Sequence, residues 1–316
     1  MSEKKFDLAG KRIWVAGHRG MVGSAVLRRL SEMGKSQILT AERDSVDLRR
    51  QADVEHWMLH NRPDVVVVAA ARVGGIKANH DRPAEFLYDN LAIEMNVIKA
   101  AHQAGVSKLL FLGSSCIYPR DANQPIKEQD LLTAPLEPTN QWYAIAKIAG
   151  IKMCQAFRRQ YGCDFISAMP SNLYGPGDNF DLQSSHVLPA LLRKIHEAKH
   201  TGCRTVTIWG SGTPRREFLY VDDLAEGLIF LLEHYSDEEP VNVGSGTDIS
   251  IRELATVIAD ILEYDGEFLF DTSMPDGTPR KLMDSTRINS LGWSPRVPLI
   301  DGIQKTYAWF LKNLKH

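Results

Sequence analysis

Short apolar runs alternate with amphipathic segments over the first half of the chain. From Arg12 onward the order is RIWVA, MVGSAVLRRLSEMG, QILT, a stretch through Trp57, and DVVVVAA. It continues with a long amphipathic stretch over about residues 83–104, KLLFLG, a second stretch over about residues 143–161, and DFISAMP. Because a period of two favours strands and a period of 3.6 favours helices, this order predicts βαβ units. Right-handed crossovers then give an α/β fold with a doubly wound parallel sheet.

The second half of the chain has a different texture. After Pro170, segments rich in Gly, Pro and Asn separate shorter helices and strands, and we interpret them as loops: SNLYGPGDNF, WGSGTPRREF and NVGSGTDIS. This pattern predicts a second, smaller α/β lobe packed against the first. We place the boundary near residue 170, which gives lobes of residues 1–170 and 171–316, with some crossing of the chain between them.

Composition narrows the partners and the location. The 316 residues are 44% hydrophobic and carry a net charge of −2, which suits a large core and gives no field that favours nucleic acid or an anionic membrane. The start, MSEKKFDLAGKR, lacks the apolar run of a signal peptide, so we expect a cytoplasmic protein without a membrane span. The four cysteines form no C-x-x-C pair, so we expect neither disulfides nor a metal site.

A glycine-rich loop follows the first predicted strand directly. It consists of Gly17, His18, Arg19, Gly20, Met21, Val22 and Gly23, and a helix begins within it. One glycine permits a tight turn, another lets the backbone approach a pyrophosphate, and a third lets the helix pack on the strand. The helix N-terminus attracts the phosphates. The loop therefore predicts a dinucleotide site in a Rossmann-like first lobe, with a simple glycine-rich turn as the alternative.

The end of the second strand bears on which dinucleotide binds. NAD enzymes of this type usually carry an acidic residue there, whereas this strand ends in Leu39-Thr40, with Glu42 and Arg43 close behind. Arg19 and Arg43 could pair with a 2′-phosphate, which favours NADP. The alternative is that both arginines are solvated surface charges, and Glu42 is the observation that argues against NADP.

A tyrosine and a lysine lie one helical turn apart in the segment YAIAK, at Tyr143 and Lys147. A nearby ammonium favours tyrosinate, so we expect the pKa of Tyr143 to fall below about 10 and the phenol to exchange a proton with a carbonyl oxygen. The spacing alone also fits an ordinary surface pair. Its occurrence together with the glycine loop and with Gly113-Ser114-Ser115 after the fourth strand favours hydride transfer at a carbonyl carbon.

These features together resemble the extended short-chain dehydrogenases: GxxGxxG after the first strand, a serine after the fourth, and YxxxK about 30 residues later. The resemblance covers nearly the whole chain. It implies that Ser114 hydrogen-bonds the carbonyl, that Tyr143 is the acid/base, and that Lys147 holds the nicotinamide ribose and tunes Tyr143. It also implies a nucleotide-sugar in the second lobe.

Four further segments resemble one branch of this family. They are GSSCIYP from Gly113, PSNLYGP from Pro170, SHV from Ser185 and PDGTPRK from Pro275. They imply NADPH-dependent epimerisation of carbons 3 and 5 of GDP-4-keto-6-deoxy-D-mannose and reduction of carbon 4, giving GDP-L-fucose. Related dehydratases carry an acidic pair after the catalytic serine or threonine, where this chain has a serine and a cysteine.

Cys116 and His186 are the proton-transfer pair that the resemblance implies for the epimerisation. In isolation, such a cysteine also fits a small buried hydrophobe, and such a histidine fits a helix cap or a satisfied polar group. The rival functions are a sugar 4-epimerase or 4-reductase acting on another nucleotide, and a regulator that senses NADPH without chemistry. The set of Ser114, Tyr143 and Lys147 argues against the sensor, which needs no acid/base.

The resemblance also implies the remaining contacts. Besides the glycine loop and Arg43, it places these residues at the cofactor: Asp47, Leu48, Leu112, Gly113, Ser115, Lys147, Pro170, Ser171, Asn172, Leu173 and His186. It places four at the substrate: Lys194, Trp209, Arg216 and Asp276. The guanidinium of Arg216 suits a diphosphate because it donates two parallel bonds; Arg215 could take that role, and an ordinary charged loop is the alternative. Helices over about 83–104 and 140–161 are expected to form a four-helix homodimer interface.

Overall fold

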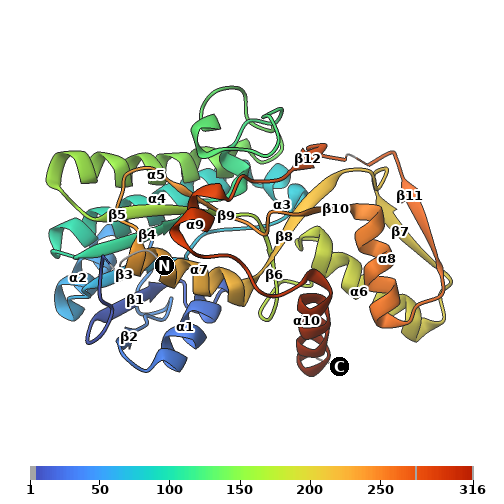
Figure 1. Cartoon of the computed structure of the whole chain (residues 1–316), viewed down its shortest axis with the longest axis horizontal. Coiled ribbons are helices and arrows are strands. Elements are labelled where there is room, and N and C mark those ends of the chain that lie inside the picture. Colours follow the sequence, from blue (N-terminus) through green and yellow to red (C-terminus); the bar gives the residue numbers. More distant parts are fainter. Residues whose placement is uncertain (1–4, 275, 315–316) are drawn as a thin grey trace.

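A six-stranded parallel sheet forms the centre of the first lobe in the computed structural model, which describes residues 5–274 and 276–314 (Figure 1). The strands are β1 (Arg12–Ala16), β2 (Gln37–Leu39), β3 (Val65–Val68), β4 (Lys108–Leu112), β5 (Phe165–Pro170) and β9 (Val241–Val243). Their order is β2-β1-β3-β4-β5-β9, and every neighbouring pair is parallel. The predicted α/β fold with a doubly wound parallel sheet is confirmed.

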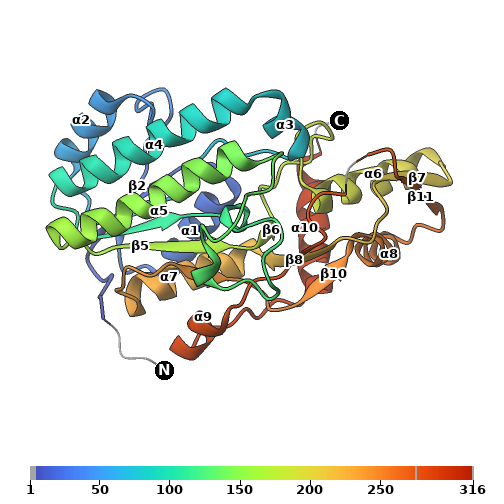
Figure 2. The same ribbon diagram turned by 90° about the horizontal axis from the view of Figure 1, so that it is seen from above.

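Helices cover both faces of this sheet (Figure 2). They are α1 (Met21–Met33), α2 (Gln51–Asn61), α4 (Pro83–Gln103), α5 (Gln141–Tyr161) and α7 (Val221–His234). Because successive side chains of a strand point to opposite faces, Ile13 and Val15 join the core beneath α1 and α7, and Trp14 and Ala16 join the core beneath α2, α4 and α5. The strands are continuously apolar in sequence because both of their faces are buried, one in each core.

The two long helices of the first lobe agree with their predictions. The stretch predicted over about 83–104 is α4, and the stretch predicted over about 143–161 is α5, which begins two residues earlier. The latter ends at Gly162, whose φ of 70° is a left-handed conformation that terminates helices. Of the helices in the described part of the chain, none is both long and apolar enough to cross a membrane.

The sheet contains a switch point beside β1. This strand lies between β2 and β3, so the chain crosses to opposite sides of β1 after its first and second strands. In sheets of this type ligands bind beyond the carboxyl ends of the strands at such a point. The glycine loop follows β1 here, and the ends of β4 and β5 lie along the same edge of the sheet.

The second lobe is built from short elements. They are β6 (Asn172–Tyr174), α6 (Val187–Thr201), β7 (Thr205–Trp209), β8 (Arg215–Tyr220), β10 (Asp248–Ser250), α8 (Ile251–Leu262), β11 (Glu267–Asp271), β12 (Arg280–Lys281) and α10 (Leu299–Asn313). The smaller helical turns of the chain are α3 (Ile76–Asp81), η1 (Ser115–Ile117), η2 (Glu128–Asp130) and α9 (Thr286–Leu291).

The interpretation of three glycine-rich segments entirely as loops was wrong. SNLYGPGDNF contains β6, WGSGTPRREF contains most of β8, and NVGSGTDIS contains the end of β9 and all of β10. These strands are stabilised by partners distant in the sequence, since β8 pairs with β6 and β12 in parallel and with β10 antiparallel. Strands this short carry too few alternating positions to show a period of two.

The chain returns to the first lobe after it has entered the second. Helix α7 packs against α1, and β9 adds the last strand to the six-stranded sheet, although both follow residue 170. Helix α9 packs on β9 in turn. The division near residue 170 therefore stays a prediction about the main body of each lobe, and the 221–243 segment belongs to the first.

Candidate active site

The glycine loop after β1 is shaped for a ligand phosphate. Gly17 has a φ of 90°, and a Cβ atom there would lie 2.6 Å from the backbone nitrogen of Ala70. A Cβ atom at Gly23 would lie 2.2 Å from the Gly17 carbonyl oxygen. Helix α1 begins directly behind Gly20, which has no side chain to cap the first amide groups. Free amide groups and the positive end of the helix dipole bind a pyrophosphate, so these residues fit a dinucleotide.

The expected 2′-phosphate site is more crowded than the sequence suggested. Arg19 Nη2 lies 2.6 Å from Glu42 Oε2, and His18 Nε2 lies 3.3 Å from Glu42 Oε1. Glu42 therefore pairs with two side chains of the glycine loop, and its carboxylate already binds the Arg19 guanidinium that a 2′-phosphate would need. Arg43 is exposed next to it. The two predicted cations are present at this corner, but one of them is paired.

Asp47 and Leu48 lie in the loop that follows β2. The Asp47 carboxylate is held by Arg49, with Nη2 to Oδ2 at 2.7 Å. This hydrogen bond is the main reason that the pKa of Asp47 is lowered to about 2, and the charge of Arg43 contributes. Asn96 Nδ2 donates to the Leu48 carbonyl oxygen at 3.0 Å and ties the loop to α4.

The other predicted cofactor residues line the carboxyl ends of the central strands. Leu112 ends β4 and Gly113 follows it, Ser115 is buried in η1, and four consecutive residues lead from β5 into β6: Pro170, Ser171, Asn172 and Leu173. Asn172 Nδ2 donates to the Glu217 carbonyl oxygen at 2.8 Å, which fixes this connection. Within the described residues, the buried Ser171 hydroxyl has no hydrogen-bond partner, so it is available to a ligand.

Ser114 and Tyr143 come together at the end of β4. The Ser114 hydroxyl accepts a hydrogen bond from the Cys116 amide at 3.3 Å and is also a partner of the Tyr143 phenol. The expected lowering of the Tyr143 pKa was wrong for the chain alone. Burial raises this pKa above its ordinary value, the charges of Cys116 and Glu94 add to the effect, and Ser114 opposes it. The phenol is therefore protonated at neutral pH, which suits a proton donor.

Lys147 faces two groups at once. Its Nζ lies 5.9 Å from the centre of the Tyr143 ring and 3.0 Å from Glu94 Oε1. The Lys147 and Glu94 side chains are 2% and 1% exposed. Burial raises the pKa of Glu94 to about 6, and Lys147 opposes this rise. Because the ammonium is paired with a carboxylate, burial rather than the lysine decides the pKa of Tyr143.

Cys116 lies among polar groups rather than in an apolar core. Its Sγ accepts from Asn140 Nδ2 at 3.5 Å and from Lys281 Nζ at 3.8 Å, and the residue is only partly buried. Arg216, whose charge interacts with it, and the Tyr143 phenol also lie nearby. The alternative of a small buried hydrophobe does not describe this cysteine, because two cations surround a reachable thiol.

His186 follows a loop of the second lobe that packs on the first lobe. The Gly75 amide donates to the Ser184 carbonyl oxygen at 3.0 Å, and a Cβ atom at Gly75 would lie 2.8 Å from the Ser185 carbonyl oxygen, so this loop packs on the first lobe by its backbone. His186 precedes α6, but its imidazole makes no capping hydrogen bond within the described chain. Surrounding protein and the charge of Lys281 lower its pKa, so the ring is neutral at pH 7.

Lys194 and Trp209, two of the predicted substrate residues, lie against each other. Lys194 Nζ is 5.7 Å from the centre of the Trp209 ring and donates to the Thr207 carbonyl oxygen at 3.0 Å. Burial lowers the pKa of Lys194. The indole is half exposed, so it offers a flat surface with a cation beside it.

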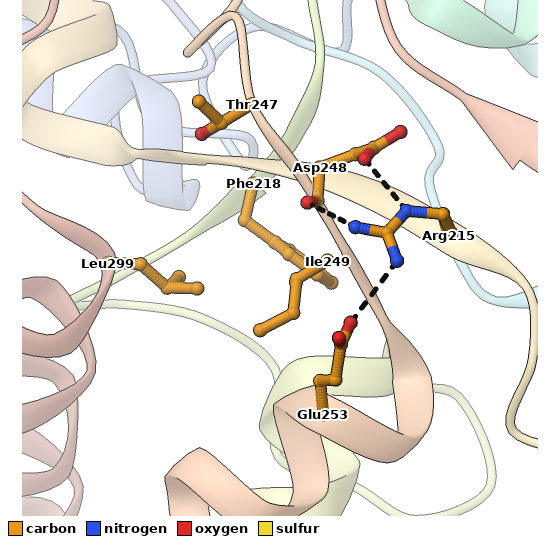
Figure 3. Close-up of a pocket in the computed structure, with 7 residues that line it drawn as sticks. All are labelled: Arg215, Phe218, Thr247, Asp248, Ile249, Glu253 and Leu299. Atoms are coloured by element: carbon orange, nitrogen blue, oxygen red, sulfur yellow. Dashed lines mark hydrogen bonds and ion pairs between the residues drawn. The ribbon is translucent and has the colours of Figure 1, made fainter.

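Arg215 and Arg216 are neighbours on β8 with different partners. Arg215 Nε bonds Asp248 Oδ1 at 2.9 Å, and its Nη1 bonds Glu253 Oε2 at 3.2 Å (Figure 3). It lines a separate cavity of about 420 Å³. Arg216 is buried enough to lower its pKa, and its charge acts on Cys116. Since the donors of Arg215 are occupied elsewhere, Arg216 is the candidate for a phosphate.

Asp276 has a structural contact in the chain alone. Its Oδ1 accepts from the Ser211 amide at 2.7 Å, and its Oδ2 accepts from the Ser211 hydroxyl at 2.9 Å. Arg216 Nη2 reaches the Asp276 carbonyl oxygen at 3.5 Å. The carboxylate thus holds the loop between β7 and β8 beside Arg216. Pro275, which begins the segment PDGTPRK, lies outside the described residues.

Three residues of this site were given no role from the sequence. Asn140 and Lys281 both contact Cys116, and Glu94 contacts Lys147. Glu94 had a detectable signal, because it lies four residues after the buried Asn90 and four before the buried Ile98, on the inward stripe of α4. No cluster of three or more His, Cys, Asp or Glu side chains suited to a metal ion occurs within residues 5–274 and 276–314.

Comparisons with known proteins show which family this chain belongs to. Residues 13–244 match the model of the NAD dependent epimerase/dehydratase family. GDP-L-fucose synthase of Sinorhizobium fredii (strain NBRC 101917 / NGR234) is 58% identical over 307 residues, 97% of this chain and 98% of that protein. GDP-L-fucose synthase 1 of Arabidopsis thaliana is 57% identical over 303 residues, 96% of this chain and 94% of that protein.

A solved structure extends the likeness to three dimensions. The crystal structure of a GDP-L-fucose synthetase from Naegleria fowleri bound to NADP has a TM-score of 0.91 at 28% identity, covering 99% of this chain and 98% of that chain. The agreement spans both lobes. The chain therefore belongs to the NAD dependent epimerase/dehydratase family.

Proposed function

We propose that this protein converts GDP-4-keto-6-deoxy-D-mannose to GDP-L-fucose by epimerising carbons 3 and 5 and reducing carbon 4 with NADPH. The observation that carries the proposal is the meeting of two sets of groups at one edge of the sheet. Ser114 and Tyr143 suit a ketone oxygen, and Cys116 lies beside them with Lys281, whose charge also reaches His186. The relatives of 57–58% identity are named GDP-L-fucose synthases, and these names support the proposed product.

The reduction uses the first set. NADPH, when bound, supplies a hydride to carbon 4 of the sugar. The Ser114 hydroxyl orients the ketone oxygen, and Tyr143 donates its phenolic proton to that oxygen as the carbonyl becomes an alcohol. The phenol then regains a proton from water. The glycine loop, Arg43 and the free hydroxyl of Ser171 are the groups that would hold the cofactor beside them.

The epimerisation uses the second set. A ketone at carbon 4 acidifies the hydrogens on carbons 3 and 5, because the electron pair left behind moves onto the ketone oxygen as an enolate. Ser114 and Tyr143 stabilise that oxygen. Of Cys116 and His186, one removes the proton and the other returns a proton to the opposite face of the same carbon. Protons removed and returned balance, so no redox change accompanies inversion.

The GDP part of the substrate has a complementary surface in the second lobe. Arg216 and Lys194 are cations with lowered pKa values due to burial, which raises the strength of their pairing with a diphosphate. Trp209 is an exposed aromatic surface beside Lys194. We place the diphosphate at Arg216, and Lys194 and Trp209 at the sugar-nucleotide.

The test of this function runs the reaction in deuterium oxide. The unmodified protein should oxidise NADPH only with GDP-4-keto-6-deoxy-D-mannose, and NMR of the product should show deuterium at carbons 3 and 5. Deuterium at both carbons is expected only with the unmodified protein, and not with Cys116→Ser or His186→Asn. Cys116→Ser should block inversion while NADPH still binds, because a serine hydroxyl is far less acidic than a thiol of pKa about 8.5. Normal exchange and inversion by both variants would assign the proton transfers to other groups.

We also propose that the protein is a cytoplasmic homodimer. Five large apolar side chains lie exposed on α4 and α5: Tyr88 (72%), Tyr161 (51%), Met95 (47%), Ile145 (40%) and Trp142 (38%). The two helices lie side by side on the outside of the lobe (Figure 2), and pairing with the same helices of a second copy would cover these side chains. All four cysteines are free thiols, as the reducing cytoplasm favours.

A further inference from the structure

Glu94 is a buried charge that the proposed reaction does not yet use. Its carboxylate lies between α4 and α5, 1% exposed, with Lys147 Nζ at 3.0 Å. Within the described residues, neither carboxylate oxygen has a partner with hydrogen-bond geometry. The ion pair with Lys147 is therefore the contact that compensates this charge.

The packing around Glu94 leaves room for its carboxylate. Helix α5 carries a glycine at the point of contact, and a Cβ atom at Gly150 would lie 2.8 Å from Glu94 Oε2 and 2.3 Å from the Phe111 ring. The same ring lies 4.7 Å from Lys147 Nζ. An alanine at position 150 would push against the ion pair, so the two helices are fitted around the carboxylate as well as around apolar side chains.

A role in stability alone does not explain this pair. Removing two charges from water costs more than their attraction returns in many proteins, and apolar side chains of similar volume often serve as well. The surroundings are apolar, since Phe111 and Ile151 belong to the adjoining core. A buried carboxylate next to an acid/base group points to a function in proton transfer.

We propose that Glu94 is a positioning residue of the reduction step, in which its carboxylate holds the Lys147 ammonium near Tyr143 and offsets its charge, so that the phenol keeps its proton until a ketone oxygen accepts it. This inference rests on the proposed function. An uncompensated ammonium would stabilise tyrosinate, as expected from the sequence. With Glu94 in place, Tyr143 is a donor over the physiological pH range and the site is set for reduction of a ketone.

Few other charged groups of the described chain lie near the Tyr143 phenol. From η1, Cys116 acts on Tyr143 in the same direction as Glu94. On α5 itself, Cys154 is buried and its pKa is raised to about 12 by burial, so it is neutral. On β4, Lys108 is at the opposite end of the strand and is paired with Asp164 at 2.6 Å. Among the described residues, Glu94 is the carboxylate whose charge acts on both Tyr143 and Lys147.

The test removes the charge and keeps the shape with Glu94→Gln. In the pH profile of kcat/KM for NADPH oxidation, the fall in activity on the alkaline side should occur at a pH about one unit or more lower than in the unmodified protein. The reason is that Tyr143 loses its proton more easily without the carboxylate. A second measurement needs no substrate. The near-ultraviolet absorbance of tyrosinate, taken as the difference from the same protein carrying Tyr143→Phe, should show the phenol titrating at lower pH in Glu94→Gln.

Two controls separate this role from folding. Asp164→Asn weakens the ion pairs that the partly exposed Asp164 makes with the buried Lys108 and with Arg158, and it should lower the unfolding temperature without moving the pH profile. Glu94→Asp keeps the charge but retracts it by one methylene, and it should move both readouts in the same direction by a smaller amount. It replaces Glu94→Gln if that variant does not fold.

The outcomes are distinguishable. An unmoved alkaline limb and an unmoved phenol titration in the Glu94 variants would overturn the role of Glu94, whatever happens to stability. If the unmodified protein fails to oxidise NADPH with the keto-sugar but the phenol titration still shifts in Glu94→Gln, the proposed function fails and the coupling of Glu94 to Tyr143 stands.

Discussion

The corner formed by Arg19, Glu42 and Arg43 yields a quantitative prediction about cofactor choice. The Arg19–Glu42 pair is exposed, at 76% and 49% of the two side chains, and exposed ion pairs are worth up to about 1 kcal/mol. Binding a 2′-phosphate must displace this pairing and approach a carboxylate. Glu42→Gln should therefore strengthen NADPH binding by up to about fivefold, the equivalent of about 1 kcal/mol, and should leave NADH binding unchanged.

The opposite change is expected when a cation is removed from this corner. A charge-assisted phosphate contact is worth about 1.5–3 kcal/mol, so Arg43→Ala should reduce the preference for NADPH over NADH by roughly tenfold or more. Both affinities can be measured by calorimetric titration at fixed low ionic strength, since salt screens exposed charges. Glu32→Gln is the matched control, because Glu32 pairs with Arg29 on the exposed side of α1. Equal affinity of the unmodified protein for NADPH and NADH, or weaker NADPH binding in Glu42→Gln, would refute this reasoning.

Three further predictions address the catalytic groups and the assembly. Tyr143→Phe should keep NADPH affinity and lose about a hundredfold or more in turnover; near-normal reduction would assign the acid elsewhere. In the unmodified protein the Lys281 ammonium disfavours the imidazolium, so Lys281→Met should raise the pKa of His186 toward its ordinary value of about 6.5. An NMR titration, with the His186 signal assigned by His186→Asn, checks this. An unchanged pKa would place the lysine charge too far away to matter. Met95→Lys should convert the proposed dimer to monomers in light scattering, whereas an unaltered mass would move the interface from α4.

Much of the fold was contained in short-range patterns. The runs RIWVA and VVVV and the 3.6-residue repeats of α4 and α5 depend on burial against their immediate layers, so the parallel sheet and its helices could be predicted. The glycine loop belongs to the same class, because Gly17 needs a positive φ and Gly23 needs close backbone contact whatever lies elsewhere. By contrast, β6, β8 and β10 were interpreted as loops. Pairing with distant segments stabilises these strands, and such pairing leaves no local pattern in the sequence.

For the site, the sequence by itself determined which groups exist, and the tertiary structure decided which of them meet. Tyr143 and Lys147 are one helical turn apart by spacing alone, but only the packing of α4 on α5 pairs that lysine with Glu94. The same packing buries the phenol, and this burial is the main reason that the pKa of Tyr143 is raised rather than lowered. Likewise, Lys281 reaches Cys116 across 165 positions of the chain. A local sequence pattern shows whether a residue is buried, but it does not show which residue of another element lies beside it. The pKa of a side chain depends on that neighbouring residue and on how much water is excluded around the side chain.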